Sequence, residues 1–413
     1  MTLLEQAQRA KASSYELLTT DTKARDGALL AMADALEANA DAILAANERD
    51  LAAARAAGRR EALLDRLALS PARIAGMAGG LRKVAALPDP VGGADYAVRR
   101  PNGLSIEKRR VPIGVVGIIY EARPNVTADA AGLCLKSANA CLLRGGSEAI
   151  HTNSAVVDCL SAAAAAFVPA DAVQLVRDTS RETAAEMMRL NGYLDVLIPR
   201  GGAGLIRSVV QTATVPVIET GAGVCHTYVD AAADISMAAA IVANAKCSRP
   251  SVCNACETLL VHRDIAARAL PAIAAALEAA HATELRGCPQ TCAILPRALP
   301  ATEEDWSAEY GDYILSVRVV DGVEEAIRHI NRYGTHHSEC IVTEHLPTAE
   351  RFLNAVDAAA VYVNASTRFT DGEEFGFGAE IGISTQKLHA RGPMGLHELT
   401  SVKYVVRGAG QVR

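Results

Sequence analysis

The chain has 413 residues, of which 50% are hydrophobic, 21% are charged and only 4% are aromatic. This length exceeds one ordinary core, so we expect two or more folding units, with cores built mainly from Ala, Val, Leu and Ile. The 41 basic and 47 acidic side chains give a net charge of −6. A mildly acidic chain has no general attraction for nucleic acid or anionic lipid, so neither is expected as a partner.

The ten cysteines are expected to be thiols in the cytoplasm. Residues 1–11 predict a helix with charged Glu5 and Arg9, not the apolar core of a signal peptide. No segment has the ~18 uninterrupted apolar residues of a membrane span. The sequence therefore predicts a cytoplasmic protein with neither a disulfide framework nor a membrane partner.

The segment 1–90 predicts helices. Thr20 and Asp21 supply capping oxygens ahead of an apolar stripe at helical spacing. The stripe consists of Ala24, Ala28, Met32 and Leu36. Gly58 is placed to end a second helix, and Ser70-Pro71 is placed to begin a third.

The pattern changes after the proline-glycine segment 87–93. Short strands at 96–100 and 104–110 flank Asn102-Gly103, which predicts a hairpin. Apolar runs then alternate with helical stretches, at 115–120, 140–143, 173–176, 194–198 and 215–218. A second series starts near Asp234, with strands at 258–261, 293–295, 316–319, 339–342 and 360–363. This alternation predicts two doubly wound α/β units with parallel sheets.

Cys253 is the candidate nucleophile. Pro250 breaks the preceding helix, so Cys253 is predicted on an irregular loop that leads into a strand. Lys246 and Arg249 are near enough in sequence to favour a thiolate. The alternative is that Cys253 is a small buried hydrophobic residue, as free cysteines commonly are.

A zinc site is a further alternative for these cysteines, because Cys253 and Cys256 form a CxxC pair and Cys288 and Cys292 a looser one. The segment between the pairs is longer than the ~15–20 residues of common zinc ribbons, and the second pair has the wrong internal spacing. No metal is therefore expected.

Asn125 follows the predicted strand 115–120 and the turn at Arg123-Pro124, so its amide is expected at the carboxyl end of a strand. A helix cap is the alternative role. Gly114 and Gly117 do not complete the GxGxxG dinucleotide fingerprint.

Glycine-rich turns follow two further predicted strands, at 144–148 and 199–204. Backbone N–H groups in such turns can bind phosphate where a helix begins, although glycine turns are also plain architecture. Glu219 follows the predicted strand 215–218, and residues 375–382 form an aromatic-glycine loop.

Three segments are similar to a known family: Ile119–Thr127, Arg249–Ala255 and Gly376–Gly395. With them the whole chain resembles the gamma-glutamyl phosphate reductase family, also called glutamate-5-semialdehyde dehydrogenases, within the aldehyde dehydrogenase superfamily. The resemblance implies an aldehyde dehydrogenase-like fold with two doubly wound parallel-sheet domains and a small oligomerisation hairpin.

The resemblance divides the chain into four parts. It implies a cofactor-binding domain at 1–93 and 111–231, and a catalytic domain at 232–364. A return segment at 365–395 is expected to line the active site. The hairpin at 94–110 and the strand within 396–413 are expected to form an inter-subunit sheet, with pairing inside one chain as the alternative.

The resemblance also implies roles for single residues. Cys253 is then the nucleophile and Asn125 the oxyanion-hole amide. The cofactor NADPH is assigned to Arg144, Gly145, Ser147, Gly201, Gly202 and Glu219. Glu219 lies where hydrolytic members keep a general base, but the sequence that follows it departs from theirs. Substrate anions are assigned to Arg123, Arg249 and Arg391.

The implied reaction is the NADPH-dependent reduction of L-glutamyl 5-phosphate to L-glutamate 5-semialdehyde and phosphate, the second step of proline biosynthesis from glutamate. A homo-oligomer, dimer or tetramer, is expected, and glutamate 5-kinase is a candidate protein partner. The rival interpretations are an acylating or hydrolytic aldehyde dehydrogenase for another substrate, and a catalytically silent scaffold of the same fold.

Overall fold

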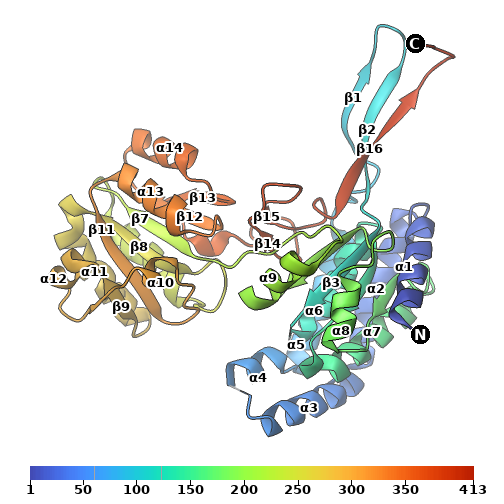
Figure 1. The fold of residues 1–413 in the computed structure, drawn as a ribbon, viewed down its shortest axis with the longest axis horizontal. Helices are drawn as coiled ribbons and strands as arrows, with labels where there is room; N and C mark the ends of the chain where they lie inside the picture. The colour runs from blue at the N-terminus through green and yellow to red at the C-terminus, as the bar shows by residue number, and fades with distance from the viewer. Residues whose placement is uncertain (60, 122) are drawn as a thin grey trace. The chain divides into compact units, whose positions relative to one another are not determined.

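The computed structural model describes residues 1–59, 61–121 and 123–413. These residues form two compact units (Figure 1). Unit 1 contains Met1–Thr220, Gly376–Gly382 and Met394–Arg413, and unit 2 contains Gly221–Phe375 and Ile383–Pro393. No helix in the described ranges is long and apolar enough to cross a membrane.

Unit 1 is built on a four-stranded parallel sheet with the order β5-β4-β3-β6. Its strands are β3 (Val115–Tyr120), β4 (Ala140–Arg144), β5 (Val173–Leu175) and β6 (Val196–Arg200). The helices that follow them are α6 (Pro124–Lys136), α7 (Ile150–Ala164), α8 (Arg181–Met187) and α9 (Ala203–Thr212). The chain runs outward from β3 to β5 and then returns to the other side of β3. This reversal makes a topological switch point between β3 and β6, where α/β proteins bind ligands.

Five helices precede this sheet in unit 1: α1 (Leu3–Leu17), α2 (Thr22–Ala38), α3 (Ala40–Ala56), α4 (Glu61–Leu67) and α5 (Pro71–Ala86). The predicted caps Asp21 and Ser70 are confirmed, whereas Thr20 does not cap α2, because its hydroxyl donates to the Glu16 carbonyl at 3.3 Å. Asp21 accepts a hydrogen bond from the Ala24 N–H at 2.7 Å, and Ser70 accepts one from the Arg73 N–H at 3.2 Å. The stripe on α2 faces inward because Ala28, Met32 and Leu36 are fully buried.

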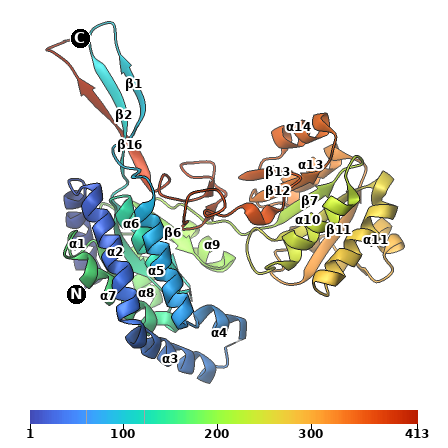
Figure 2. The ribbon, with the colours of Figure 1, turned by 180° about the vertical axis from the view of Figure 1, so that it is seen from behind.

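A three-stranded antiparallel sheet completes unit 1, with the order β1-β2-β16. Its strands are β1 (Ala94–Arg99), β2 (Ser105–Pro112) and β16 (Thr400–Arg407). The hairpin turn is the predicted one, since Gly103 has φ +88° and its N–H donates to the Arg100 carbonyl at 2.9 Å. Strand β16 pairs with β2 along its whole length, within one chain. The alternative, in which this strand pairs with its own hairpin within one chain, is therefore confirmed for β16 and β2, and the expectation that the sheet also joins subunits stays a prediction. Figures 1 and 2 show these strands extending from the helices of unit 1.

Unit 2 contains a seven-stranded parallel sheet with the order β10-β9-β11-β8-β7-β12-β13. Its strands are β7 (Cys225–Val229), β8 (Cys256–His262), β9 (Glu284–Gly287), β10 (Leu299–Pro300), β11 (Ile314–Val320), β12 (Ser338–Val342) and β13 (Ala360–Val363). Its helices are α10 (Ile235–Cys247), α11 (Arg263–Ala280), α12 (Pro289–Ile294), α13 (Val323–Tyr333) and α14 (Leu346–Ala355). Helices α10 and α11 cover one face, and α13 and α14 cover the other (Figure 1). The fold prediction of doubly wound parallel sheets is confirmed.

Several strand predictions differ from the structure, and the short strands β9 and β10 are absent from the prediction. Residues 293–295, predicted as a strand, lie at the end of α12, because Pro289 follows Cys288 and is suited to the first turn of a helix. Residues 215–218 form no strand, only the single bridge between Leu197 and Val217. Strand β7 was not predicted, because the polar His226 and Thr227 interrupt its apolar pattern.

Candidate active site

Cys253 lies on the predicted loop, in the turn between α10 and β8, and its side chain is half-buried. Cys256 is the first residue of β8 and is fully buried. Burial raises the pKa of Cys256 to about 12, so this thiol stays protonated and inert near neutral pH. Of the CxxC pair, only Cys253 is accessible to a substrate.

The backbone of Cys253 is fixed by residues just before and at the start of β7. A Cβ atom on Gly223 would lie 1.5 Å from the Cys253 carbonyl oxygen, so only glycine permits this approach. The Gly223 N–H donates to Glu309 Oε1 at 2.9 Å, and Cys225 Sγ donates to the Cys253 carbonyl at 3.2 Å. The nucleophile loop is thus held against the start of a central strand.

A distant segment holds the same loop from the other direction. Asn254 is buried, and its amide donates to the carbonyls of Arg368 at 3.3 Å and Thr370 at 3.0 Å. Thr367 Oγ1 donates to the Asn254 carbonyl at 2.7 Å, and the Arg368 guanidinium donates to Asn254 Oδ1. Sequence reasoning missed Arg368, since these partners lie 113 to 116 residues apart and no local pattern links them.

Of the two cations expected near Cys253, Lys246 is paired with another residue. Lys246 is fully buried and forms an ion pair with Glu257 at 2.6 Å, so the expectation that Lys246 favours the thiolate is corrected. Arg249 is exposed on the loop. Arg368 takes the place of the second cation: burial lowers the pKa of its guanidinium, and the neighbouring charge of Arg249 lowers it further.

In unit 1, Asn125 is exposed in the first turn of α6, directly after the carboxyl end of β3. Its Nδ2 donates to Asp129 Oδ2 at 3.3 Å, one turn further along the helix. Burial raises the pKa of Asp129 to about 6. The N-cap position belongs to Arg123, which is exposed and makes no side-chain capping bond. The capping alternative for Asn125 therefore does not hold.

The glycine-rich turn after β6 presents an anion site. Gly202 is the N-cap of α9, and its N–H donates to the Glu121 carboxylate at 2.8 Å. The Glu121 N–H donates in turn to the Arg200 carbonyl at 3.1 Å. A carboxylate thus occupies the N-terminus of α9, at the switch point, in the way that a phosphate would. A Cβ on Gly201 would approach that carboxylate to 2.7 Å.

The end of β4 and the turn after it contain three more predicted cofactor residues, Arg144, Gly145 and Ser147. Arg144 is half-buried, and its Nη2 donates to the carbonyls of Thr179 at 2.6 Å and Ser180 at 3.1 Å. Its buried Nε has no hydrogen-bond partner among the described residues. Gly145 is buried and Ser147 is exposed in the following turn. A glycine-rich turn, an anion site at a helix start and an orphaned guanidinium N–H fit the polar groups of a nicotinamide dinucleotide.

Two further predicted residues are Glu219 and Arg391, which belong to different units. Glu219 of unit 1 is half-buried, next to the buried Thr220, whose hydroxyl donates to the Pro199 carbonyl at 2.9 Å. Arg391 of unit 2 forms an ion pair with Asp357 at 2.7 Å. The pKa of Asp357 is lowered to about 2 by Lys387 and Arg391, so the charge of Arg391 is already balanced.

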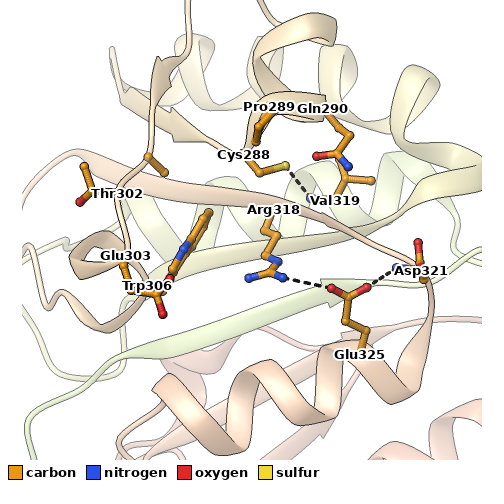
Figure 3. A pocket seen from close by; sticks show the side chains of 11 residues that line it. Cys288, Pro289, Gln290, Thr302, Glu303, Trp306, Arg318, Val319, Asp321 and Glu325 are labelled. Carbon is orange, nitrogen blue, oxygen red and sulfur yellow. Dashed lines mark hydrogen bonds and ion pairs between the residues drawn. The ribbon is translucent and has the colours of Figure 1, made fainter.

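Figure 3 shows a surface pocket in unit 2 that Cys253 does not line. It is at the carboxyl end of β11, whereas Cys253 precedes the amino end of the adjacent parallel strand β8. In this pocket Arg318 donates to Glu325 at 3.1 Å and stacks on Trp306 at 5.6 Å. Its cation is therefore already paired, and the pocket is not the candidate active site.

The chain matches the model of the aldehyde dehydrogenase family over residues 2–286 and 307–405. The chain belongs to this family of oxidoreductases, which use a nicotinamide cofactor.

Within the family, the chain is similar at high identity to gamma-glutamyl phosphate reductases. The gamma-glutamyl phosphate reductase of Moorella thermoacetica is 61% identical over 407 residues, which cover 98% of this chain and 97% of the relative. That of Enterococcus faecalis is 58% identical over 412 residues, covering 100% and 99%. The crystal structure of the Thermotoga maritima gamma-glutamyl phosphate reductase matches with a TM-score of 0.97 at 49% identity, covering 100% of this chain and 99% of that one. The family resemblance predicted from the sequence is confirmed.

Proposed function

We propose that this chain reduces L-glutamyl 5-phosphate to L-glutamate 5-semialdehyde and phosphate with NADPH, in the second step of proline biosynthesis from glutamate. The observation that supports this best is the accessible Cys253 thiol on a loop held from two sides, in a chain that matches gamma-glutamyl phosphate reductases over its whole length. A cytoplasmic location agrees with ten cysteines that are all thiols.

In this proposal the Cys253 thiolate attacks the acyl carbon of the acyl phosphate. The C–O bond to phosphate breaks, inorganic phosphate leaves, and the acyl group remains on sulfur as a thioester. Covalent catalysis divides a difficult reduction into two easier steps. Bound NADPH would supply the hydride that reduces this thioester. The C–S bond of the resulting thiohemiacetal then breaks, which releases the aldehyde and restores the thiolate.

In this proposal the other predicted residues stabilise negative charge or position the cofactor and the substrate. Asn125 donates its amide N–H to the oxygen that becomes negative when sulfur attacks. Gly202 and the start of α9 bind the cofactor pyrophosphate, Arg144 binds near the adenosine ribose, and Gly145, Ser147, Gly201 and Glu219 shape the same site. Arg249 binds a substrate anion, and Arg123 and Arg391 remain further candidates for that role.

The direct test is the reverse reaction, with semialdehyde, NADP⁺ and phosphate. NADPH formation that requires phosphate supports the proposal. Oxidation that depends on coenzyme A would instead favour an acylating aldehyde dehydrogenase, and oxidation that needs only water a hydrolytic one. No turnover with any acceptor would favour the silent scaffold.

Asn125→Ala is expected to lower kcat by about 10²–10³-fold, because one oxyanion donor contributes on that order. NADPH affinity should change little, since the amide acts mainly in the transition state. Steady-state kinetics and a fluorescence titration with NADPH measure both quantities. A rise in KM with kcat intact would instead make Asn125 a substrate-positioning residue.

We also propose that the β1-β2-β16 sheet joins subunits into a homo-oligomer. The two outer strands β1 and β16 are mostly exposed, and they include exposed Tyr96, Tyr404 and Val406. An exposed edge with apolar side chains requires a partner or invites aggregation. Deleting residues 400–413, which contain β16, should therefore lower the oligomeric state or make the protein insoluble. Sedimentation measures this, and a full-length monomer at micromolar concentration would refute it.

A further inference from the structure

Arg368 lies beside the nucleophile loop although it is remote in sequence. It belongs to the short helix η3 (Thr367–Phe369), whose neighbours Ser366, Thr367 and Thr370 are buried, so its backbone position is fixed. Its Nε donates to Ser248 Oγ at 3.1 Å, and its Nη1 donates to Asn254 Oδ1. Since these partners stand on either side of Cys253 in the loop, the guanidinium lies along the loop that presents the thiol.

The charge of Arg368 is not neutralised by an ion pair in the described ranges, although the nearby charge of Asp371 opposes the lowering of its pKa. Both of its hydrogen-bond partners are neutral, and in the described ranges neither Arg368 nor Arg249 forms an ion pair with a carboxylate. Arg391 and Arg351 of the same unit are each paired with one. Burial and the charge of Arg249 both lower the pKa of Arg368, so two cations are held close together at a free-energy cost. An anion that contacts both guanidinium groups would remove that cost.

The substrate of the proposed function offers one anion at this position. Its phosphoryl group is joined through a single oxygen to the carbon that Cys253 attacks. Its α-carboxylate lies at the other end of the glutamyl chain. A cation beside the thiol therefore meets the phosphoryl group, whose oxygens match the planar fork of a guanidinium.

We infer that Arg368, together with Arg249, binds the phosphoryl group of the acyl phosphate and retains the phosphate as it leaves. This inference rests on the proposed function and extends it to a residue that acts on the leaving group. In the reverse direction the same two guanidinium groups bind inorganic phosphate for its attack on the thioester.

The test uses the full-length enzyme in the reverse direction, with inorganic phosphate as the varied substrate. Arg368→Gln should raise the KM for phosphate by about tenfold or more, the size expected when a charge-assisted hydrogen bond is lost. Arg368→Lys keeps the charge but not the planar fork of the guanidinium, so its KM for phosphate should lie between those of the wild type and Arg368→Gln. The KM for NADP⁺ should stay within about twofold in both variants. Arg351→Gln is the matched control, because it removes an exposed, carboxylate-paired arginine by the same change.

A second readout separates this inference from the proposed function. A rapid burst of NADPH from semialdehyde and NADP⁺ without phosphate reports thioester formation alone. No burst and no turnover in the wild type would refute the proposed function. A normal burst in Arg368→Gln with a raised KM for phosphate supports the inference. An unchanged KM for phosphate in an Arg368→Gln variant with a normal burst would overturn the inference. Equal losses in the burst and in the phosphate-dependent rate would also overturn it, because they mark a purely structural role.

Discussion

Cys253→Ser is expected to lower turnover by on the order of 10³-fold or more, because the variant lacks the nucleophile that forms the thioester. A serine hydroxyl needs a neighbouring base for activation, and the cations near this loop, Arg249 and Arg368, cannot act as bases. NADPH affinity should remain close to that of the wild type, since the predicted cofactor residues lie elsewhere in the sequence. Initial rates in the reverse direction and a binding titration measure the two effects.

Two other cysteines of this region provide the controls. Cys256→Ser and Cys247→Ser should each keep most of the activity. Cys256 is buried in β8 with its thiol near Thr227, and Cys247 ends α10 with its thiol near Thr283. If Cys256→Ser were inactive and Cys253→Ser active, the assignment of the nucleophile would be wrong.

Local signals in the sequence predicted most of the fold. Asp21 and Ser70 mark helix starts because a capping oxygen works within three residues of its own position. Asn102-Gly103 marks the hairpin for the same local reason. The buried strands β3 and β4 appear as apolar runs, since a parallel sheet covered on both faces has no polar side.

What the sequence did not reveal depends on long-range pairing. His226 is polar, yet it lies fully buried in β7 because its ring contacts the Glu339 carboxylate of β12 at 3.0 Å. The contact of Arg368 with Asn254 likewise joins two polar residues that are far apart in the sequence. The prediction for Lys246 was wrong for the converse reason. Its nearness in sequence suggested a role beside Cys253, but its side chain is buried and pairs with Glu257. A polar residue whose partner is on another element gives no signal in a single sequence.

Lys246→Met is expected to destabilise the protein by about 3–5 kcal/mol at alkaline pH, because it leaves the Glu257 carboxylate buried without its cation. The two side chains are 0% and 1% exposed and 2.6 Å apart. Burial raises the pKa of Glu257 to about 7, although Lys246 opposes the rise. Without Lys246 this pKa rises further, so the folded variant takes up a proton at Glu257.

The pH dependence of the stability follows from this rise in the pKa of Glu257. A carboxyl whose pKa is higher in the folded than in the unfolded protein costs no stability at low pH, where both states are protonated, and costs more as pH rises through the folded value. In the wild type this cost is complete above about pH 7, whereas in the variant it continues to grow. The loss of stability relative to wild type should therefore be smaller at pH 6 than at pH 8.5. Urea-induced unfolding at the two pH values measures it.

Two further variants distinguish the buried charge from a loss of packing. Lys246→Met/Glu257→Leu replaces the pair by apolar side chains and should recover most of the lost stability, since a well-packed apolar pair often matches a buried ion pair. Arg351→Met breaks the exposed pair with Glu324, whose side chains are 53% and 55% exposed, and should cost no more than about 1 kcal/mol. A double variant as unstable as Lys246→Met, with the same loss at both pH values, would show that packing of the Lys246 stem, rather than the charge left on Glu257, determines the effect.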